Sequence, residues 1–255
     1  QSSMLTMPIE RLGIPSLAMT DGPHGVRADR EEVGRPTGLT TAFPTGGYAH
    51  SFGLERYCQA GLVRDRDGLE RFLVMQLEGS GGPCDATAVA GALRAAARDD
   101  LEACRRLDAT LEAMKVVKEF REGSRQMGRQ TLRVAVALTG DRNLAIYLDD
   151  VDVDRTPGHH AVAFGMVAGT LGWDATAAAI AFLYSTTALL VGAALRLLPM
   201  GQLEGQGVLW SLHPVIERVA QEAAERAPED LWSFTPGLDI QGMLHERLDA
   251  RLFRS

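Results

Sequence analysis

"DDLEACRRLDATLEAM", residues 99–114, carries the plainest structural pattern in the sequence. Its apolar residues recur at intervals of three and four, with acidic and arginine residues between them: Leu101, Cys104, Leu107, Leu111 and Met114. This spacing predicts an amphipathic helix with one buried face. The carboxylates of Asp99 and Asp100 suit the start of such a helix because they oppose the helix dipole.

Outward from this helix, proline divides the chain into two parts. Five of the eleven prolines lie in the first 44 residues, and none lies between Pro83 and Pro157. Since proline breaks helices, the first part is expected to form loops and short extended pieces, and the rest is predicted to be all-α. Helices are expected at about 115–138, from Thr156-Pro157-Gly158 to about 171, at 175–195 with Asp174 as cap, at 201–226, and after Pro236. The "GSGG" stretch, residues 79–82, is interpreted as a helix-breaking turn.

Composition excludes several classes of function. The chain has 255 residues, 45% of them hydrophobic, and a net charge of −7 with both signs interspersed. No basic run alternates with aromatic residues, so no nucleic-acid partner is expected. The three cysteines, Cys58, Cys84 and Cys104, form no CxxC motif, and the start of the sequence lacks a secretion-signal pattern. Both features indicate a cytoplasmic protein.

The stretch from Ala175 to Leu195 carries no charge and is long enough to span a bilayer. It is built mostly of Ala, Thr and Ser, which insert poorly into lipid. A buried helix in a bundle is therefore the favoured interpretation, with no membrane partner. A membrane-helix protein is the alternative.

Residues 9–27, "IERLGIPSLAMTDGPHGVR", resemble the N-terminal part of family 3 glycoside hydrolases, the β-glucosidase family. In that family the Asp of this segment binds sugar hydroxyls, and the matching position here is Asp21. The family's nucleophile lies in a Ser-Asp-Trp context, and no Ser-Asp pair occurs in this sequence. The catalytic barrel needs about 250 residues of its own. The resemblance therefore implies a fragment of a glycoside hydrolase without activity.

From Phe43 onward the chain resembles a different family, the urease accessory protein UreF. Five blocks in order carry this resemblance: "FPTGGYAHSFGLE", "REGSRQMGRQTLR", "HHAVAFGMVAGTLGWD", "FLYSTTALLVGAALRLLPMGQLEGQ" and "SFTPGLDIQGMLHERLDARLFRS". The tetrapeptide Ala-Phe-Pro-Thr, residues 42–45, belongs to both family patterns. We therefore expect a chimeric sequence, with a glycoside-hydrolase-like appendage at 1–42 and a UreF-like helical domain at 43–255.

The resemblance to UreF implies a nickel-insertion chaperone subunit rather than an enzyme. Such a protein dimerises, binds UreD (also called UreH) and recruits the GTPase UreG, which delivers nickel to apo-urease. We expect no cofactor and no metal site. "GSGG" lacks a following Gly-Lys-Ser/Thr and is no phosphate-binding loop. His159 and His160 are adjacent and would point about 100° apart on a helix, so a role at a helix N-terminus or surface is favoured over chelation.

The resemblance also implies partner-binding residues. The paired glycines before Tyr48 and His50 permit unusual backbone angles and are expected to place both side chains at a surface where the GTPase docks. The alternative is that both simply pack under the loop. Arg196 ends an apolar helix, at a position where the family often has a basic residue facing the GTPase, although the helix dipole alone explains a cation there. Tyr184 resembles a position at the UreD contact, and a buried core tyrosine is its alternative. Ser51 and Glu55 are interpreted as a structural helix start.

The C-terminal segment, residues 243–255, mixes arginines with apolar residues: Arg247, Leu248, Arg251, Leu252, Phe253 and Arg254. This composition is typical of a free tail that becomes ordered on a partner. The family usually reads Tyr-Ser-Arg-Leu-Phe where this chain reads Asp-Ala-Arg-Leu-Phe. Asp249 therefore replaces an aromatic anchor with a carboxylate, and weaker partner binding is expected there.

Overall fold

The computed structural model describes residues 4–5, 18–19, 46–248 and 250–255. The chain divides into two compact units, Gln1–Phe43 and Pro44–Ser255. In the first unit β1 (Met4–Leu5) pairs antiparallel with β2 (Ala18–Met19), and Met4 lies opposite Met19. Asp21 lies outside the described residues. The glycoside-hydrolase-like origin of residues 1–42 and the chimeric join stay predictions.

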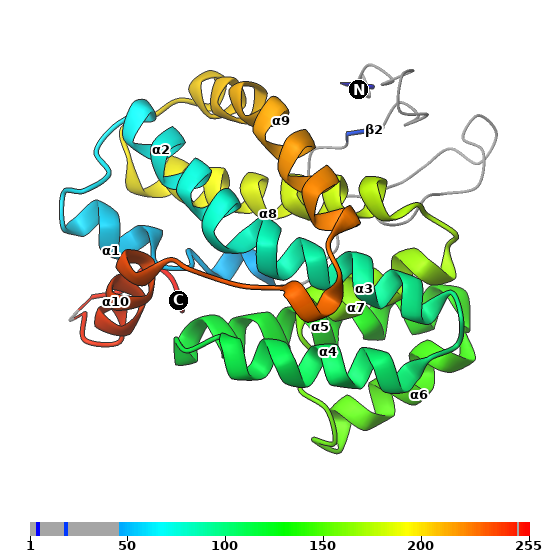
Figure 1. Cartoon of the computed structure of the whole chain (residues 1–255). Coiled ribbons are helices and arrows are strands. Elements are labelled where there is room, and N and C mark those ends of the chain that lie inside the picture. The colour runs from blue at the N-terminus through cyan, green and yellow to red at the C-terminus, as the bar shows by residue number, and fades with distance from the viewer. Residues whose placement is uncertain (1–3, 6–17, 20–45, 249) are drawn as a thin grey trace. The chain divides into compact units, whose positions relative to one another are not determined.

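The second unit is all-α, which confirms the predicted fold class (Figure 1). Its α-helices are α1 (Leu54–Gln59), α2 (Arg66–Gln76), α3 (Thr87–Ala96), α4 (Leu101–Met114), α5 (Lys118–Thr139), α6 (Arg142–Asp152), α7 (His160–Thr170), α8 (Ala175–Leu197), α9 (Gln202–Glu225) and α10 (Pro236–His245). Two 3-10 turns, η2 (Gly47–Ala49) and η4 (Pro228–Asp230), and a π-helical segment, η3 (Leu77–Ala86), complete it.

An aspartate precedes and caps each of four of these helices. The side chains of Asp65, Asp100, Asp141 and Asp174 each accept a hydrogen bond from the backbone N–H three residues further on, at 2.8–2.9 Å. Each bond satisfies one of the N–H groups that a helix start leaves without a partner. The predicted start of α4 and the predicted cap of α8 are confirmed.

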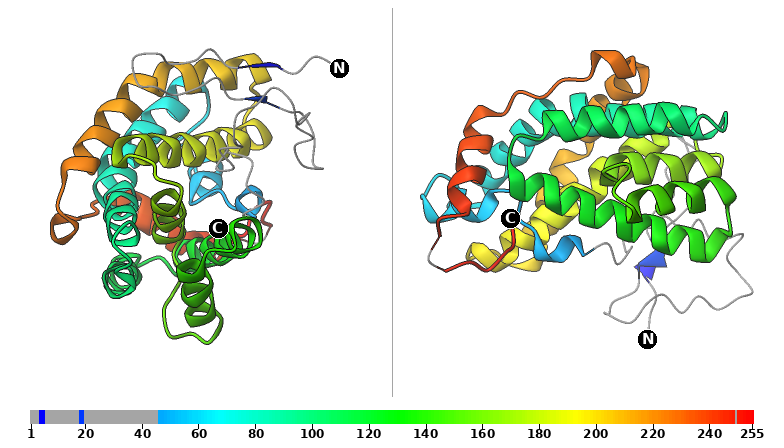
Figure 2. Two further views of the ribbon diagram at one scale, coloured as in Figure 1. Left: turned by 90° about the vertical axis from the view of Figure 1, so that its right-hand side faces the viewer. Right: turned by 90° about the horizontal axis from the view of Figure 1, so that it is seen from below.

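The core lies where α3 and α7 pack side by side, as the views in Figure 1 and Figure 2 show. Every residue of α3 except Arg94 and Ala96 is buried, and α7 is buried from His160 to Ala168. A Cβ added at Gly165 or Gly169 would collide with a carbonyl oxygen of α3. These small residues therefore allow the two backbones to approach closely.

Helix α8 packs along α9 and against α3. Among the described helices it is the one long and apolar enough to cross a membrane, with a mean hydropathy of 1.9. Half of that apolar stretch is buried inside the protein. A buried core helix can reach the same length and hydropathy as a membrane-spanning helix. The packing of α8 on α9 and α3 therefore favours the predicted bundle helix.

The interpretation of "GSGG" as a helix-breaking turn is wrong. Helix α2, η3 and α3 follow one another without a break from Arg66 to Ala96, and η3 contains Pro83. The glycines instead make room for neighbours: a Cβ at Gly82 would collide with Val219 of α9, and one at Gly79 would lie 2.8 Å from Thr235 Cγ2. Close packing from distant parts of the sequence thus overrides the local preference of glycine for turns.

Candidate interaction surface

Three residues that the sequence singled out separately meet in space. The guanidinium carbon of Arg196 lies 4.5 Å from the ring centroid of Tyr48 and 4.3 Å from that of Phe253. Arg196 Nη1 also donates to the carbonyl of Tyr48 at 3.4 Å. Cation–π contact of this kind is favourable within about 6 Å. We call these three residues the Arg196 cluster.

Each member of the Arg196 cluster is placed by a different local structure. Tyr48 sits in η2, which follows Gly46 in the left-handed conformation at φ 79°. Arg196 lies in the last turn of α8, where the helix dipole favours a cation. Phe253 is 4% exposed, whereas Tyr48 is 77% exposed. The cluster therefore presents one anchored aromatic ring and one ring that is open to a partner.

The prediction that the C-terminal segment is a free tail is wrong for its last residues. The backbone N–H groups of Leu252 and Phe253 donate to the carboxylate of Glu55, at 2.8 and 3.1 Å. Glu55 lies in the first turn of α1 and is 2% exposed. A buried carboxylate with such donors fixes the segment against α1, and the marked chain end lies near α1 and α10 in Figure 1. The sequence separation of about 200 residues hides this contact from pattern analysis.

A buried histidine extends this anchor. His245 is fully buried, with Nε2 3.0 Å from Glu55 Oε2 and Nδ1 2.7 Å from Glu119 Oε2. Each ring nitrogen of His245 thus lies within hydrogen-bond distance of a carboxylate, one from α1 and one from α5. Arg251 Nη1 donates to Glu119 at 2.7 Å. We call Glu55, Glu119, His245 and Arg251 the tail anchor.

His50 belongs to the interior rather than to the surface. It is 3% exposed, and its Nδ1 lies 2.8 Å from Ser255 Oγ. Burial, with the nearby charge of Arg254, holds the pKa of His50 below its usual value. Ser51 donates from both its N–H and its hydroxyl to a main-chain oxygen of Ser255. The expected surface position is therefore correct for Tyr48 but wrong for His50, which packs under the turn.

The other predicted site residues lie apart from the Arg196 cluster. Tyr184 is half-buried, with its ring centroid 5.8 Å from that of His213, which is 5.5 Å from that of Trp210. Trp210 is 75% exposed. Arg247 is exposed and follows α10. Asp249 lies outside the described residues.

Two features of this surface were not predicted from the sequence. Glu55 was assigned only to a helix start, although it also binds the C-terminal segment. No local pattern marks a buried carboxylate whose donors come from the other end of the chain. Trp210 was not singled out. Trp210 lies on α9 between Leu209 and Leu212, which are buried. On a helix, residues 209 and 212 share one face, so Trp210 faces outward.

The histidines at the start of α7 are structural. His159 precedes α7 and His160 opens it, and burial lowers the pKa of the first to about 3 and of the second to about 4. They lie at a helix N-terminus, as predicted, but not at a surface. Within the described residues no group of three or more His, Cys, Asp or Glu side chains is placed to hold a metal ion.

The cysteines are free thiols rather than a disulfide framework. Burial raises the pKa of Cys58 to about 11, and the pKa values of Cys84 and Cys104 to about 12. These thiols remain protonated near neutral pH, and a protonated thiol is a poor nucleophile and a poor metal ligand.

The described unit is thus an all-helical protein whose candidate site is an exposed aromatic and arginine surface anchored by its own C-terminal segment. A model of the UreF family matches residues 63–213. The chain is 32% identical over 213 residues to the urease accessory protein UreF of Bacillus sp. (strain TB-90), an alignment covering 84% of this chain and 94% of the relative. The UreF of Trichodesmium erythraeum (strain IMS101) is 34% identical over 215 residues, with 83% and 91% covered. The chain belongs to the UreF family of urease accessory proteins.

Proposed function

We propose that this protein acts in urease maturation as a subunit of the nickel-insertion machinery. In this role it binds UreD and, with it, recruits the GTPase UreG to apo-urease in the cytoplasm, as a homodimer and without chemistry of its own. Membership of the UreF family supports a role in urease maturation. The resemblance noted in the sequence supplies the particular partners.

The Arg196 cluster is the observation that carries the proposal. It joins residues 48, 196 and 253 into one surface, and these are positions where the family resemblance implies partner contact. Aromatic and arginine side chains dominate binding energy in protein interfaces. Because Tyr48 is 77% exposed, its ring adds little to the stability of the core. A tyrosine held over an arginine at the surface suits recognition of a partner instead.

Tyr184 and its neighbours supply a second contact in this proposal. The rings of Tyr184, His213 and Trp210 lie on α8 and α9, tilted against one another by 47° and 49°, and Trp210 is open to solvent. We assign this aromatic patch to UreD or to the second subunit of the dimer. Arg247 and Arg254, both exposed, extend the charged surface beside the last residues.

Co-expression with UreD and UreG from a related urease operon tests the proposal. The full chain is expected to co-purify with both partners, and a 1–242 truncation is expected to lose UreG. Arg196→Ala in the full chain serves as a finer variant, with the exposed Arg64→Ala as its matched control. A soluble, helical full chain that recovers neither partner would contradict the proposed function.

A further inference from the structure

The last residues of the chain dock on the helical body as a peptide ligand docks on a receptor. The N–H groups of Leu252 and Phe253 donate to the carboxylate of Glu55. The N–H of Arg254 donates to the carbonyl of Ala49, at 2.8 Å. Three consecutive backbone donors are thus satisfied by residues about 200 positions away in the sequence. Main-chain hydrogen bonds of this kind give a bound peptide its affinity.

The side chains of this segment alternate between the body and solvent. Phe253 and Ser255 are buried, and the residue before each of them is exposed. The ring of Phe253 lies against the guanidinium of Arg196, and the hydroxyl of Ser255 lies 2.8 Å from His50 Nδ1. The body therefore contacts alternate side chains of the segment. Sites that recognise extended peptides obtain their specificity in this way.

The surface that receives the segment is built from other elements. We call Ala49, His50, Ser51, Glu55 and Arg196 the receptor site. The first four lie in or beside η2 and α1, and Arg196 lies in the last turn of α8. Helix α8 packs directly on both α1 and η2. The receptor site is therefore held together by contacts that do not pass through the last residues.

Little apolar surface holds the segment in place. Among residues 250–255, Phe253 is the one hydrophobic side chain that is buried, and Leu252 is 51% exposed. A segment with few buried apolar contacts opens at a lower free energy than the core. The last residues can therefore leave the receptor site while the helices stay folded.

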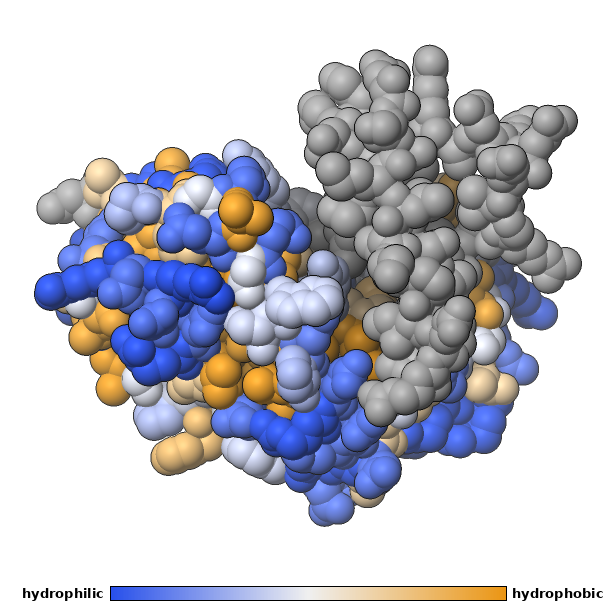
Figure 3. Space-filling model, turned by 90° about the horizontal axis from the view of Figure 1, so that it is seen from above, coloured by the Kyte–Doolittle hydropathy of each residue, from blue (hydrophilic) through white to orange (hydrophobic). Residues whose placement is uncertain are grey.

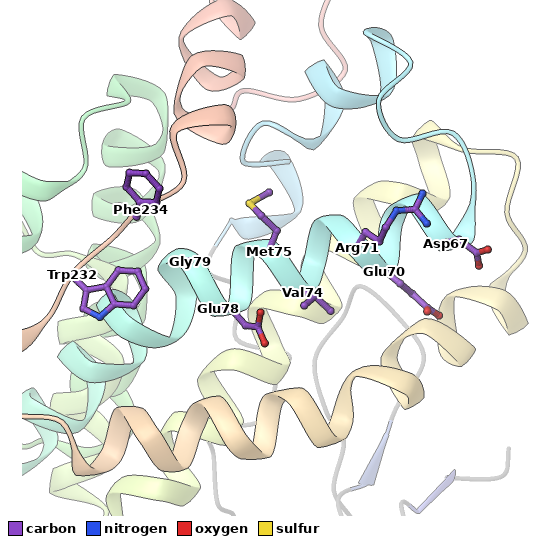
Figure 4. Close-up of a pocket in the computed structure, with 9 residues that line it drawn as sticks. All are labelled: Asp67, Glu70, Arg71, Val74, Met75, Glu78, Gly79, Trp232 and Phe234. Carbon is purple, nitrogen blue, oxygen red and sulfur yellow. The ribbon is translucent and has the colours of Figure 1, made fainter.

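Other parts of the described surface specify a ligand less clearly. A hollow of about 770 Å³ lies on α2 (Figure 4), but Glu70 and Glu78, two of its carboxylates, already pair with arginines. On the face drawn in Figure 3, the described hydrophobic residues are scattered among hydrophilic ones. The receptor site differs from both, because a peptide that fits it is present in the structure.

We propose that the receptor site is a peptide-binding site that exchanges the chain's own last residues for the same segment of a second copy of the chain. The second copy is the occupant because the sequence that fits the site is the chain's own. Exchange of identical elements between two copies reuses the contacts that already exist. The inference stands on contacts within the chain, so its failure would leave co-purification with UreD and UreG unaffected.

A labelled peptide with the sequence of residues 250–255 stands in for the segment of a second copy, and fluorescence anisotropy measures its binding to the full chain. In the wild-type chain the tethered segment competes at an effective concentration of about 1 mM, so weak binding is expected. Phe253→Ala removes the buried ring of the tethered segment and is expected to bind the peptide at least tenfold more tightly than the wild type. Leu252→Pro removes an N–H donor instead and is expected to have the same effect.

Controls separate the receptor site from other surfaces. Phe234→Ala removes a phenylalanine that is 75% exposed and lies outside the site, so it is expected to bind the peptide as weakly as the wild type. In the Phe253→Ala chain, a peptide with alanine in place of its phenylalanine is expected to bind at least tenfold more weakly. Adding Glu55→Gln to that chain is expected to weaken binding of the original peptide by at least tenfold, because Glu55 accepts two of its N–H groups.

A competition experiment tests the second copy as the occupant. An unlabelled Glu55→Gln chain, whose last residues are loosened but intact, is expected to displace the labelled peptide from the Phe253→Ala chain. The double variant Glu55→Gln/Phe253→Ala is expected not to displace it. Failure of the Glu55→Gln chain to compete with a peptide that itself binds would rule out a second copy.

Two further results would overturn the inference. If the Phe253→Ala and Leu252→Pro chains, both helical by circular dichroism, bind the peptide no more tightly than the wild type, the segment does not exchange. Equal binding of the alanine-containing peptide would show that the peptide binds elsewhere.

Discussion

Replacing Glu55 by Gln removes the charge that holds the last residues of the chain. The carboxylate accepts from the N–H groups of Leu252 and Phe253 and lies 3.0 Å from His245 Nε2. The Oε2 atom takes two of these three contacts. In Gln an NH2 group occupies one of the two oxygen positions and faces donors, so at least one strong contact is lost and the remaining bonds lose their charge.

The magnitude follows from the number of bonds. A hydrogen bond to a charged group contributes about 1.5–3 kcal/mol and a neutral one about 1 kcal/mol, so loss of one charged bond and weakening of the other two cost about 3 kcal/mol together. No solvent discount applies, because Glu55 is 2% exposed. Since each 1.4 kcal/mol corresponds to about a factor of ten, opening of the segment becomes about 100-fold more frequent.

Amide hydrogen exchange measures this opening directly. In Glu55→Gln the amides of Leu252 and Phe253 are expected to exchange about 100-fold faster, while those of α3 and α7 keep their protection. Glu70→Gln is the control, because the Glu70 carboxylate makes exposed hydrogen bonds and leaves the segment untouched. Unchanged exchange at both amides in Glu55→Gln, or an increase shared equally by the whole chain, would refute the reasoning.

Further predictions concern acid stability, packing and the Arg196 cluster. Burial lowers the pKa of His160 to about 4, so as pH falls below about 6.5 the unfolded state takes up a proton at this residue before the folded state does. Acidification from pH 7 to 5 is therefore expected to lower the free energy of unfolding by about 2 kcal/mol through His160. Denaturant melts of His160→Phe should show a smaller difference in stability between these two pH values. Gly128→Ala is expected to destabilise by about 2–3 kcal/mol in the same assay, because its Cβ would lie 2.7 Å from the backbone carbon of His159; Gly192→Ala, which meets open space within α8, should stabilise by about 0.5–1 kcal/mol, and equal effects would contradict the packing argument. Arg196→Ala is expected to weaken UreG binding at least tenfold by calorimetry while leaving the melting temperature within about 2 °C, and Arg196→Lys should recover only part of that affinity.

The helices were largely predictable because their signals are local. The apolar spacing in 101–114 marks α4, and Asp100 and Asp174 bond to the helix starts that they were expected to cap. These features depend on residues three or four positions apart. Helices and their caps can therefore be predicted from the sequence without knowledge of the tertiary fold.

The errors share a physical cause, which is contact over long sequence distances. The glycines at 79–82 indicated a turn, but their space is filled by Val219 and Thr235, which no local pattern reveals. The composition of 243–255 indicated a free tail, but Glu55 supplies the buried acceptor that holds it. His50 was placed at the surface by its neighbouring glycines, whereas its partner is Ser255. The members of the Arg196 cluster were singled out by resemblance, and their meeting in space could not be derived from spacing.

We propose that η2, the end of α8 and the last residues form one partner-binding surface. Hydrogen exchange of the full chain, alone and in complex with UreD and UreG, tests it most directly. We expect that UreG, added to the complex with UreD, protects residues 46–55 and 250–255 together. Protection confined to other segments, with both of these unchanged, would contradict it.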